Sequence, residues 1–394
     1  MPPAPPPPPS PLSWVGDALA DLEGEGLRRQ RRVGPLGGSG VIDFGSNDYL
    51  GLADDPRLAE AAADAARELG WGAGASPIVS GRSEVHAELE RQVAEFEGAE
   101  AALLFPSGFA ANAGVVPALV GRGDALYADA KNHASLIDGC RLSGAQRRVY
   151  PHNDVASLAP FLAADRGRFR RRLIVTDGLF SMDGDFAPLA ELGRLAEKHD
   201  AMLLVDEAHA TGVWGENGRG SVEHFSTGAP KLHRQASVRV GTLSKALGSA
   251  GGFVAGSAEL IDWLANRARP YVFSTAAPPA IAAAAIAALR IVAEEPERRA
   301  RVRELADDLR ARLAAAGWST AGSASQIVPI RVGDPSRAVT LSERLADAGV
   351  YAPAIRPPSV PPGESLLRVS VSARHSAADF ERLVAGLGEP VRPA

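Results

Sequence analysis

Gly241-Thr242-Leu243-Ser244-Lys245-Ala246-Leu247-Gly248 places a single lysine in a turn that is rich in glycine and hydroxyl side chains and that follows an apolar strand. Such a turn suits an amine that forms a Schiff base with a bound aldehyde. Taken alone, however, the pattern is more typical of a lysine in a solvated loop. The role of Lys245 therefore depends on which other side chains the chain brings to the same place.

A second motif, Asp206-Glu207-Ala208-His209, follows the buried-strand pattern of residues 201–205. Open α/β sheets bind their ligands at the edge formed by the carboxyl ends of the strands. The same four letters match the magnesium-binding box of a nucleic-acid-dependent ATPase, but the sequence lacks the phosphate-binding pattern G-x-x-x-x-G-K-[ST] that this function requires. A helix cap at Asp206 and a surface histidine at His209 remain the structural alternative.

A third motif predicts a phosphate site. Residues 101–105 form a short apolar strand pattern, and the following residues 106–112 turn it into a helix. The first amides of a helix have no intrahelical acceptors, so they bind phosphate through their N–H groups and the helix dipole. An ordinary serine N-cap is the alternative. The candidate phosphate-binding residues are Ser107, Gly108 and Phe109, with the hydroxyl groups of Thr242 and Ser244 as further donors.

Two more strand patterns end in polar loops. Asn132-His133-Ala134-Ser135 follows the apolar residues 125–128, so the imidazole of His133 could lie flat on an aromatic ring. Residues 173–177 open into the polar loop 178–185. Each loop alone is more often ordinary surface than a ligand site. Because all these strands end at one edge of the predicted sheet, together they indicate a site for a phosphorylated aromatic aldehyde.

The combination of motifs resembles the α-oxoamine synthases, which are pyridoxal-phosphate enzymes of fold type I. The resemblance extends over residues 14–388, and it is specific because the order and spacing of several motifs match together. It implies pyridoxal 5'-phosphate as the cofactor and no metal ion. The motifs are Ser46-Asn47-Asp48-Tyr49-Leu50-Gly51-Leu52, Ser107-Gly108-Phe109-Ala110-Ala111-Asn112, Asn132-His133-Ala134-Ser135, Asp206-Glu207-Ala208-His209-Ala210-Thr211-Gly212 and Gly241-Thr242-Leu243-Ser244-Lys245.

The resemblance implies a role for each residue around the cofactor ring. Lys245 would hold the cofactor and then take the α-proton of the substrate, for which its pKa must fall from about 10.4. Asp206 would keep the pyridine nitrogen protonated. His209 and Ser181 would bind the phenolic oxygen, and His133 would stack on the ring. The implied catalytic residues are Lys245, His133, Asp206 and His209.

The resemblance also assigns residues to the substrates and to a partner subunit. Arginine binds carboxylates through a bidentate fork. Arg368 would bind the amino-acid carboxylate, and Arg28, within the basic residues 28–32, would meet the acyl substrate. A solvated helix face is the alternative for this basic cluster. Members of the family are homodimers, and Thr275 matches a position that reaches the cofactor phosphate of the neighbour. The implied substrate-binding residues are Arg28, Asn47, His133, Ser359 and Arg368.

Two further segments indicate which member of the family the chain resembles. Ala354-Ile355-Arg356-Pro357-Pro358-Ser359-Val360-Pro361 and Pro151-His152-Asn153-Asp154 resemble the member that serves biotin biosynthesis. That member condenses L-alanine with a pimeloyl thioester of coenzyme A or of acyl carrier protein. Residues 71–81 depart from the family pattern, because Ala75 and Pro77 restrict a loop that is usually richer in glycine, and this could alter the thioester preference.

Two alternative functions stay open. One is a sister synthase that uses glycine or serine with another acyl-CoA. The other is a noncatalytic homologue that binds the cofactor and partners. The presence of Lys245, Asp206, His209 and His133 argues against the second alternative.

The length of 394 residues and the alternation of strands and helices predict an α/β fold. Strand patterns near residues 103, 126, 148, 174, 204, 240 and 253 predict a mostly parallel, seven-stranded sheet with helices on both faces. Residues 295–394 predict a small α+β domain behind the large domain of residues 46–294. Residues 1–12 predict a disordered proline-rich tail, and residues 13–45 an N-terminal arm.

Composition excludes several classes of function. The net charge of -5 shows no excess of basic residues of the kind that binds nucleic acid. Cys140 is the single cysteine, so no internal disulfide can form. The N-terminus has no basic and apolar segments typical of a secretory signal, and no apolar run is long enough to cross a membrane. We therefore expect a cytoplasmic protein.

Overall fold

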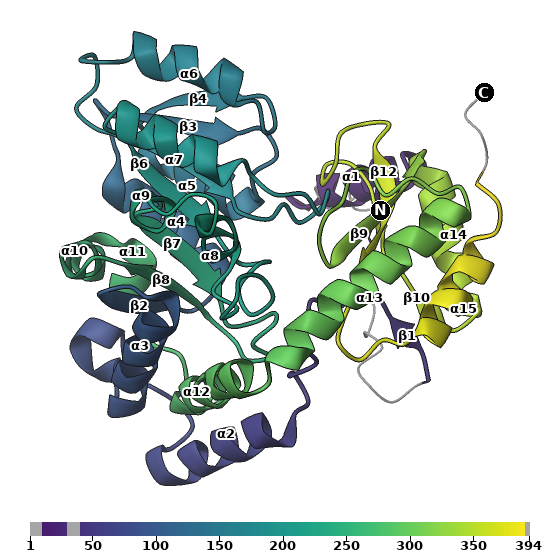
Figure 1. Ribbon diagram of the computed structural model, residues 1–394, viewed down its shortest axis with the longest axis horizontal. Coiled ribbons are helices and arrows are strands. Elements are labelled where there is room, and N and C mark those ends of the chain that lie inside the picture. Colours follow the sequence, from purple (N-terminus) through teal and green to yellow (C-terminus); the bar gives the residue numbers. More distant parts are fainter. Residues whose placement is uncertain (1–9, 30–39, 391–394) are drawn as a thin grey trace, which may run out of the picture.

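A seven-stranded sheet forms the centre of the larger part of the molecule (Figure 1), in a computed structural model that describes residues 10–29 and 40–390. The strand order is β2-β8-β7-β6-β5-β3-β4. Strand β8 runs antiparallel to β2 and β7, and the other neighbouring pairs are parallel. The predicted strands are confirmed as β2 (Ala101–Phe105), β3 (Ala125–Asp129), β4 (Gln146–Tyr150), β5 (Arg172–Asp177), β6 (Met202–Asp206), β7 (Val238–Thr242) and β8 (Gly252–Gly256).

Both faces of this sheet are covered by helices, as predicted. Alternate residues of a strand enter different hydrophobic clusters, because successive side chains point to opposite faces. Leu204 of β6 packs in the cluster with helices α4, α5 and α10, whereas Leu203 and Val205 pack in the cluster with α6, α7 and α9. These helices are α4 (Gly108–Leu119), α5 (Ala134–Ser143), α6 (Val155–Ala164), α7 (Leu189–Lys198), α9 (Leu232–Gln235) and α10 (Ala258–Arg267).

The remaining helices of the larger part lie around the β2 edge and the connecting loops (Figure 1). Helix α12 (Pro279–Glu294) packs against α2 (Pro56–Leu69) and α3 (Glu84–Glu97). It begins at two successive prolines, which the first turn of a helix tolerates because its N–H groups have no intrahelical acceptor. Shorter elements are a π-helical turn (Pro77–Gly81), α8 (Ser221–Ser226) and α11 (Arg269–Val272).

The smaller part contains a three-stranded antiparallel sheet of order β11-β12-β9. Helix α13 (Pro296–Ala315) leads into it from the larger part (Figure 1). Near the N-terminus, β1 (Ile42–Asp43) pairs with β10 (Val350–Tyr351), which the sequence did not predict. The other elements are α1 (Trp14–Gly24), β9 (Ile327–Gly333), α14 (Pro335–Asp347), β11 (Ala354–Ile355), β12 (Ser365–Ser370) and α15 (Ala377–Leu387).

The division into domains stays a proposal. One hydrophobic cluster joins Phe44 to residues 306–387, and the other clusters are drawn mainly from residues 49–292. Residues 1–9 of the predicted proline-rich tail lie outside the described residues. Within the described residues, no helix combines the length and apolar character needed to cross a membrane. The cytoplasmic location stays a prediction.

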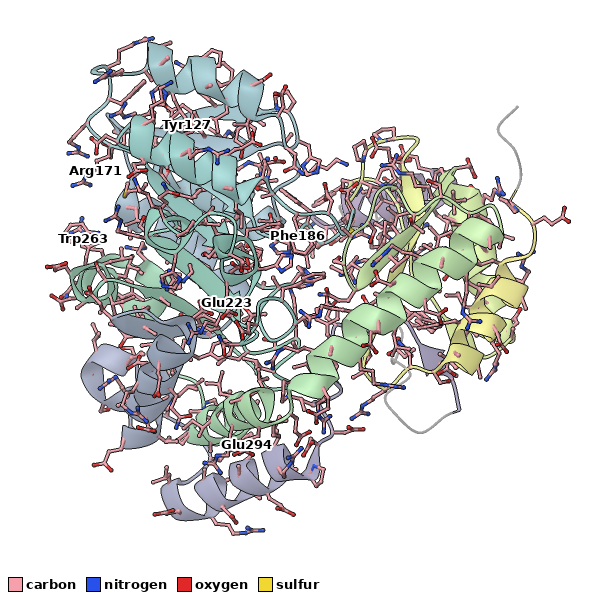
Figure 2. The ribbon with its side chains drawn as sticks, viewed as in Figure 1. Tyr127, Arg171, Phe186, Glu223, Trp263 and Glu294 are labelled. Atoms are coloured by element: carbon pink, nitrogen blue, oxygen red, sulfur yellow. The ribbon has the colours of Figure 1, made fainter. Side chains whose placement is uncertain are left out.

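The loop after β5 faces the smaller part. Figure 2 shows its residue Phe186 on this side of the larger part, whereas Arg171 and Trp263 lie on the side away from the smaller part. This loop also carries Ser181, one of the predicted site residues. The loop is therefore placed where residues of both parts can meet.

Candidate active site

The carboxyl ends of the parallel strands bring the predicted motifs to one edge of the sheet. Asp177 at the end of β5 lies opposite Asp206 at the end of β6, and Asp206 lies opposite Val240 of β7. The turn that carries Lys245 follows β7 directly. The structure thus places Lys245 at the same edge as Asp206, as the strand patterns predicted.

Lys245 contacts His209 at the centre of this edge. The Lys245 Nζ atom lies 2.8 Å from His209 Nε2, and His209 Nδ1 lies 2.7 Å from the Tyr49 hydroxyl. Burial lowers the pKa of the Lys245 amine to about 8, although the Asp206 carboxylate acts in the opposite direction. Burial and the Lys245 charge hold the pKa of His209 well below its usual range, so its ring is neutral. A lysine with this pKa is much closer to its neutral form at physiological pH than an exposed lysine.

The hydrogen-bond chain beyond Tyr49 defines the tautomer of His209. Arg368 can only donate, and its Nη1 donates to Asn47 Oδ1 at 3.0 Å. The Tyr49 hydroxyl also donates to Asn47 Oδ1, at 3.1 Å. The Tyr49 oxygen must therefore accept from His209 Nδ1–H, which leaves the lone pair of Nε2 directed at Lys245. The sequence predicted no role for Tyr49.

Asp206 is held in a buried position by two donors. Its side chain is 4 % exposed and accepts from the backbone N–H of Ala208 at 2.8 Å and from Asn112 Nδ2 at 2.5 Å. The contact of Asn112 with Asp206 was not predicted from the sequence. A signal existed, because Asn112 lies four residues after Gly108 on helix α4 and is a polar residue on its otherwise apolar buried face.

The predicted phosphate site lies where helix α4 begins. Phe105, Gly252 and Thr242 are in register across β2, β8 and β7. A Cβ atom at Gly252 would come within 2.5 Å of Gly108 N, and one at Gly108 would lie 3.4 Å from Thr242 Cβ. The two glycines thus allow the helix N-terminus to approach Thr242 closely.

The hydroxyl groups around this N-terminus already have partners. Ser107 is the N-cap residue, and its Oγ accepts from Ala110 N at 3.0 Å. The hydroxyls of Thr242 and Ser244 lie 3.1 Å apart and both donate to the carbonyl of Gly251. Donation from either hydroxyl to a phosphate would require it to rotate away from Gly251. The backbone N–H groups at Gly108 and Phe109 are the more direct donors.

His133 is connected to Asp206 through a chain of hydrogen bonds. Its Nδ1 lies 2.7 Å from Ser135 Oγ, which accepts from Asn112 Nδ2 at 2.9 Å. The backbone N–H of His133 donates to Asp177 Oδ2 at 2.7 Å. Burial, followed by the charge of Asp206, raises the pKa of Asp177 well above its usual range. The sequence predicted Asp177 only as the end of a strand, and nothing in it predicted the contact with His133.

Arg368 joins the smaller part of the molecule to the site. Its side chain is 6 % exposed, and its Nε donates to the backbone carbonyl of Ser181 at 2.6 Å. Its Nη1 also donates to Ser370 Oγ at 2.8 Å. The contact between the Ser181 carbonyl and Arg368 was not predicted from the sequence. The predicted contact of Ser181 with the phenolic oxygen of the cofactor stays a prediction.

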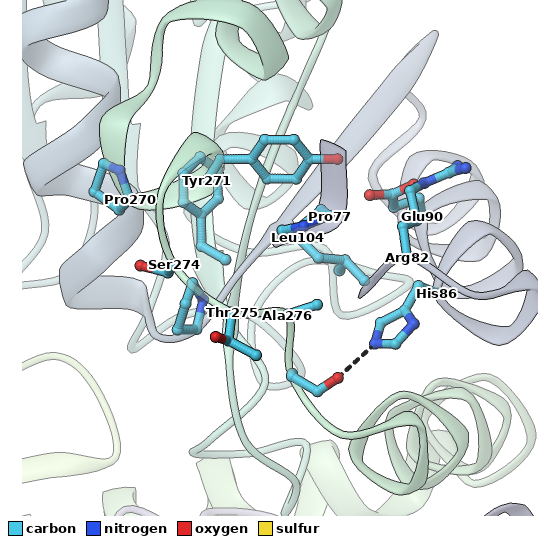
Figure 3. Close-up of a pocket in the computed structure, with 13 residues that line it drawn as sticks. Pro77, Arg82, His86, Glu90, Leu104, Pro270, Tyr271, Ser274, Thr275 and Ala276 are labelled. Carbon is cyan, nitrogen blue, oxygen red and sulfur yellow. Dashed lines mark hydrogen bonds and ion pairs between the residues drawn. The ribbon is translucent and has the colours of Figure 1, made fainter. Parts of the chain in front are cut away.

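Three predicted residues lie apart from the Lys245 network among the described residues. Arg28 pairs with Glu23 at 3.1 Å on the surface, and Ser359 accepts from Arg29 Nη2 at 3.0 Å. Residues 30–32 of the basic cluster lie outside the described residues. Thr275 lies beside Ser274 and Ala276 in a pocket that also contains Tyr271 and His86 (Figure 3). The roles of Arg28, Ser359 and Thr275 stay predictions.

The residues at this edge fit pyridoxal 5'-phosphate. The set contains an amine of lowered pKa for an aldehyde, a buried carboxylate for a pyridine nitrogen, and a helix N-terminus for a phosphate. Because Gly108 and Gly252 have no side chains, the first N–H groups of helix α4 can lie next to Thr242. The fold and the site together define a pyridoxal-phosphate enzyme of fold type I.

Similar proteins of known family belong to the same class, and they identify the family within it. Residues 39–387 match the family described as Aminotransferase class I and II. The 8-amino-7-oxononanoate synthase of Anaeromyxobacter dehalogenans is 50% identical, with 95% of each chain covered. That of Geobacter sulfurreducens is 49% identical, covering 95% of this chain and 96% of the relative. The chain belongs to the 8-amino-7-oxononanoate synthase family, within the class I and II aminotransferases.

Solved structures show the same fold. Serine palmitoyltransferase from S. paucimobilis, with a bound PLP–myriocin aldimine, superposes with a TM-score of 0.88 at 31% identity. The match covers 95% of this chain and 96% of that chain. The 8-amino-7-oxononanoate synthase from Francisella tularensis gives a TM-score of 0.76 at 27% identity, covering 88% of this chain and 96% of that chain.

Proposed function

We infer that the protein is a pyridoxal-phosphate-dependent acyltransferase of biotin biosynthesis. It condenses L-alanine with a pimeloyl thioester and releases carbon dioxide and the free carrier to form 8-amino-7-oxononanoate. The identity of 50% over 95% of both chains carries this inference. The joint placement of Lys245, His209 and Asp206 at one sheet edge supports it.

The bound cofactor supplies an electron sink for negative charge at the α-carbon of the substrate. We propose that Lys245 takes the α-proton of L-alanine, because its amine has a lowered pKa of about 8. His209 orients this amine through Nε2. Asp206, fixed by Asn112 and by the Ala208 N–H, would keep a proton on the pyridine nitrogen of the bound cofactor.

Arg368 is proposed to bind the carboxylate of L-alanine. Its guanidinium is buried, and its Nε and Nη1 atoms donate to the Ser181 carbonyl and to Asn47. These two hydrogen bonds fix the orientation of the guanidinium. A fixed guanidinium binds a carboxylate with little further loss of side-chain entropy. Arg28, Ser359 and the N-terminus of α4 remain proposals for the acyl substrate and the cofactor phosphate.

A panel of substrates tests the proposed function. We expect purified protein loaded with pyridoxal phosphate to convert L-alanine and pimeloyl-CoA, or the pimeloyl acyl carrier protein, into a product with the mass of 8-amino-7-oxononanoate. Glycine with a short-chain acyl-CoA and serine with palmitoyl-CoA serve as the comparison reactions. Faster turnover of either comparison pair would identify a sister synthase, and no product from any pair would favour the noncatalytic alternative.

We also propose that the protein acts as a homodimer. Large apolar side chains are exposed on the segments next to the Thr275 pocket, including Phe273 at 69% and Val79 at 76%. Such exposure indicates a surface that a partner covers. The proposed partner is a second copy of the chain, whose cofactor phosphate Thr275 would reach.

The substitution Phe273→Asp is expected to weaken this dimer, raising its dissociation constant by about tenfold or more, because a carboxylate would be buried against apolar surface. Val149→Asp is the matched control, since Val149 is exposed on β4, the strand at the opposite edge of the sheet from β2. Mass measurement across a dilution series checks this. An unchanged dissociation constant for Phe273→Asp would contradict the proposed interface, and a monomeric unmodified protein would contradict the dimer itself.

A further inference from the structure

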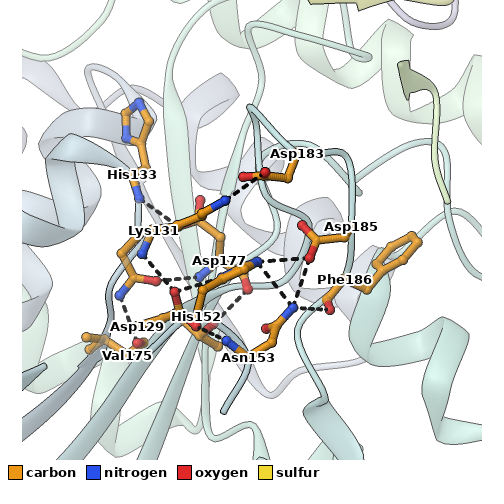
Figure 4. A network of polar contacts seen from close by, with 12 residues as sticks. Asp129, Lys131, His133, His152, Asn153, Val175, Asp177, Asp183, Asp185 and Phe186 are labelled. Carbon is orange, nitrogen blue, oxygen red and sulfur yellow. Dashed lines mark hydrogen bonds and ion pairs between the residues drawn. The ribbon is translucent and has the colours of Figure 1, made fainter. Parts of the chain in front are cut away.

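The Pro151-His152-Asn153-Asp154 segment has no role in the mechanism above, yet it forms a defined polar centre (Figure 4). His152 Nδ1 lies 3.0 Å from Asp129 Oδ1, and His152 Nε2 lies 2.9 Å from Asp185 Oδ2. An ionised carboxylate can only accept hydrogen bonds. Both ring nitrogens must therefore donate, which makes the ring an imidazolium cation.

The local environment agrees with this protonation state. Burial alone would disfavour the cation, but the hydrogen bonds and charges of Asp129 and Asp185 outweigh it and raise the pKa of His152 to about 9. The ring also meets the Phe180 ring edge-on, with centroids 4.4 Å apart. The His152 ring is thus fixed by a carboxylate at each nitrogen and by contact with the Phe180 ring.

His152 joins two loops that approach the active site. Asp129 ends β3, and its Oδ1 also accepts from the backbone N–H of Lys131, two residues before His133. Asp185 lies in the loop between β5 and α7 that carries Ser181. This loop is closed on itself, because Phe180 N donates to the Asp185 carbonyl at 3.0 Å.

Asn153 reinforces the same connection. Its backbone N–H donates to Asp129 Oδ2 at 2.8 Å, and its Nδ2 donates to Asp185 Oδ2 at 3.0 Å. In the part of the chain that the structure describes, the other charged side chains nearby form ion pairs with one another and not with His152. Lys131 Nζ lies 2.8 Å from Asp183 and 3.8 Å from Glu364. Arg331 of β9 lies 3.7 Å from Asp183 and 3.9 Å from Glu364.

A metal ion is a weaker explanation of this cluster. His152, Asp183 and Asp185 each offer a ligand atom within 4.8 Å of the others. However, both nitrogens of His152 are already bound to carboxylates, and the Lys131 ammonium already pairs with Asp183. The imidazolium and the ammonium therefore supply the positive charge that a metal ion would bring.

We propose that His152 is a positioning residue. Its imidazolium binds the loop that carries Ser181 to the end of β3 through Asp185 and Asp129. This contact fixes the Ser181 carbonyl, which in turn orients Arg368. Ser181 O accepts from Arg368 Nε at 2.6 Å, so movement of the loop would move the guanidinium. The role in alanine binding rests on the proposed function, whereas the fastening of the loop does not.

The pH dependence of this contact follows from the sign of the pKa shift. The pKa of His152 in the folded protein, about 9, lies above its ordinary value of 6.5. The stability that this contact contributes is therefore fully present below about pH 6.5 and is lost as the pH rises through about 9, where the imidazolium itself loses its proton. The loop should loosen and the KM for L-alanine should rise over this upper range.

The test compares four proteins, all loaded with pyridoxal phosphate: the unmodified chain, His152→Gln, Asp185→Asn and His199→Gln. Amide hydrogen-exchange protection of residues 178–187 and the KM for L-alanine are measured from pH 6 to pH 10, together with kcat. His199→Gln is the matched control, since His199 is the C-cap residue of α7 and, among the described residues, no hydrogen bond or ion pair joins it to this cluster.

We expect the unmodified chain and His199→Gln to lose protection of the loop with a midpoint near pH 9. Asp185→Asn should lower this midpoint by about 1 unit or more, because one of the two charges that stabilise the imidazolium is gone. His152→Gln should show low protection at every pH and a KM raised about tenfold, with a smaller change in kcat, as expected for lost positioning of a substrate-binding group.

An unchanged pH midpoint in Asp185→Asn, or a pH-dependent loop in His152→Gln, would overturn the proposal. Retention of the cofactor by each variant, followed by its absorbance after gel filtration, shows whether the site itself is intact. If the loop responds as expected while no protein turns over alanine, the proposed function fails and the fastening of the loop stands.

Discussion

Replacement of Lys245 by alanine is expected to lower kcat by about a thousandfold or more, because the variant loses the group proposed to take the α-proton. The Lys245 amine contacts His209 at 2.8 Å, and its loss leaves the hydrogen bonds from His209 to Tyr49 and from Tyr49 to Asn47 in place. The fold should therefore survive. Steady-state kinetics with L-alanine and the pimeloyl thioester measure the effect, and thermal unfolding confirms that the variant is folded.

Lys231→Ala is the control for this experiment. Lys231 is an exposed lysine that pairs with Glu197 at 3.4 Å, so its removal should leave kcat within about twofold and the stability within about 0.5 kcal/mol. Near-normal turnover in Lys245→Ala would show that another group removes the proton. A folded, inactive Lys245→Ala beside an active Lys231→Ala is the predicted pair of results.

Asp206→Asn is expected to have the next largest effect, a fall in kcat of about a hundredfold or more with the cofactor still retained. The carboxylate accepts from the Ala208 N–H and from Asn112 Nδ2. An asparagine has one acceptor oxygen in place of two, and it carries no charge to raise the pKa of the pyridine nitrogen. The amide would also direct its NH2 group at one of these donors.

The comparison for Asp206→Asn is Asp200→Asn, at a position whose side chain is fully exposed. We expect Asp200→Asn to keep normal turnover. Cofactor content by absorbance and kcat by product formation are measured on both variants. Comparable kcat values for Asp206→Asn and the unmodified chain would mean that Asp206 is not the residue that acts on the ring.

The sheet could be predicted from the sequence because most of its strands are short, buried apolar runs that end in a polar or glycine residue, whereas β4 is mostly exposed. Residues 202–206 and 238–242 are examples: the side chains of the first strand enter clusters on both faces of the sheet, and Val238 and Val240 of the second enter one of these clusters. The pairing of β1 with β10 could not be predicted, since each strand has two residues and their positions are far apart in the chain. Such short elements carry no periodic signal of their own.

The ends of the strands also predicted where the candidate site lies, since parallel strands bring their carboxyl ends together. What joins the side chains there was not predictable. Asn112 meets Asp206 and Tyr49 meets His209 across long sequence separations, and neither contact leaves a local pattern. Glu207 shows the same limit: it stands between Asp206 and His209 in the motif but accepts from Ser221 N and Val222 N at the start of α8.

The central claim is that Lys245 holds pyridoxal phosphate, and borohydride reduction tests it most directly. The loaded protein is reduced, digested and analysed by mass spectrometry, with Lys231 and Lys198 as internal comparisons on the same chain. We predict that the peptide containing Lys245 carries the added mass of the reduced cofactor and that those containing Lys231 and Lys198 do not. Attachment at another lysine, or an unlabelled Lys245 peptide in protein that retains the cofactor, would contradict the account.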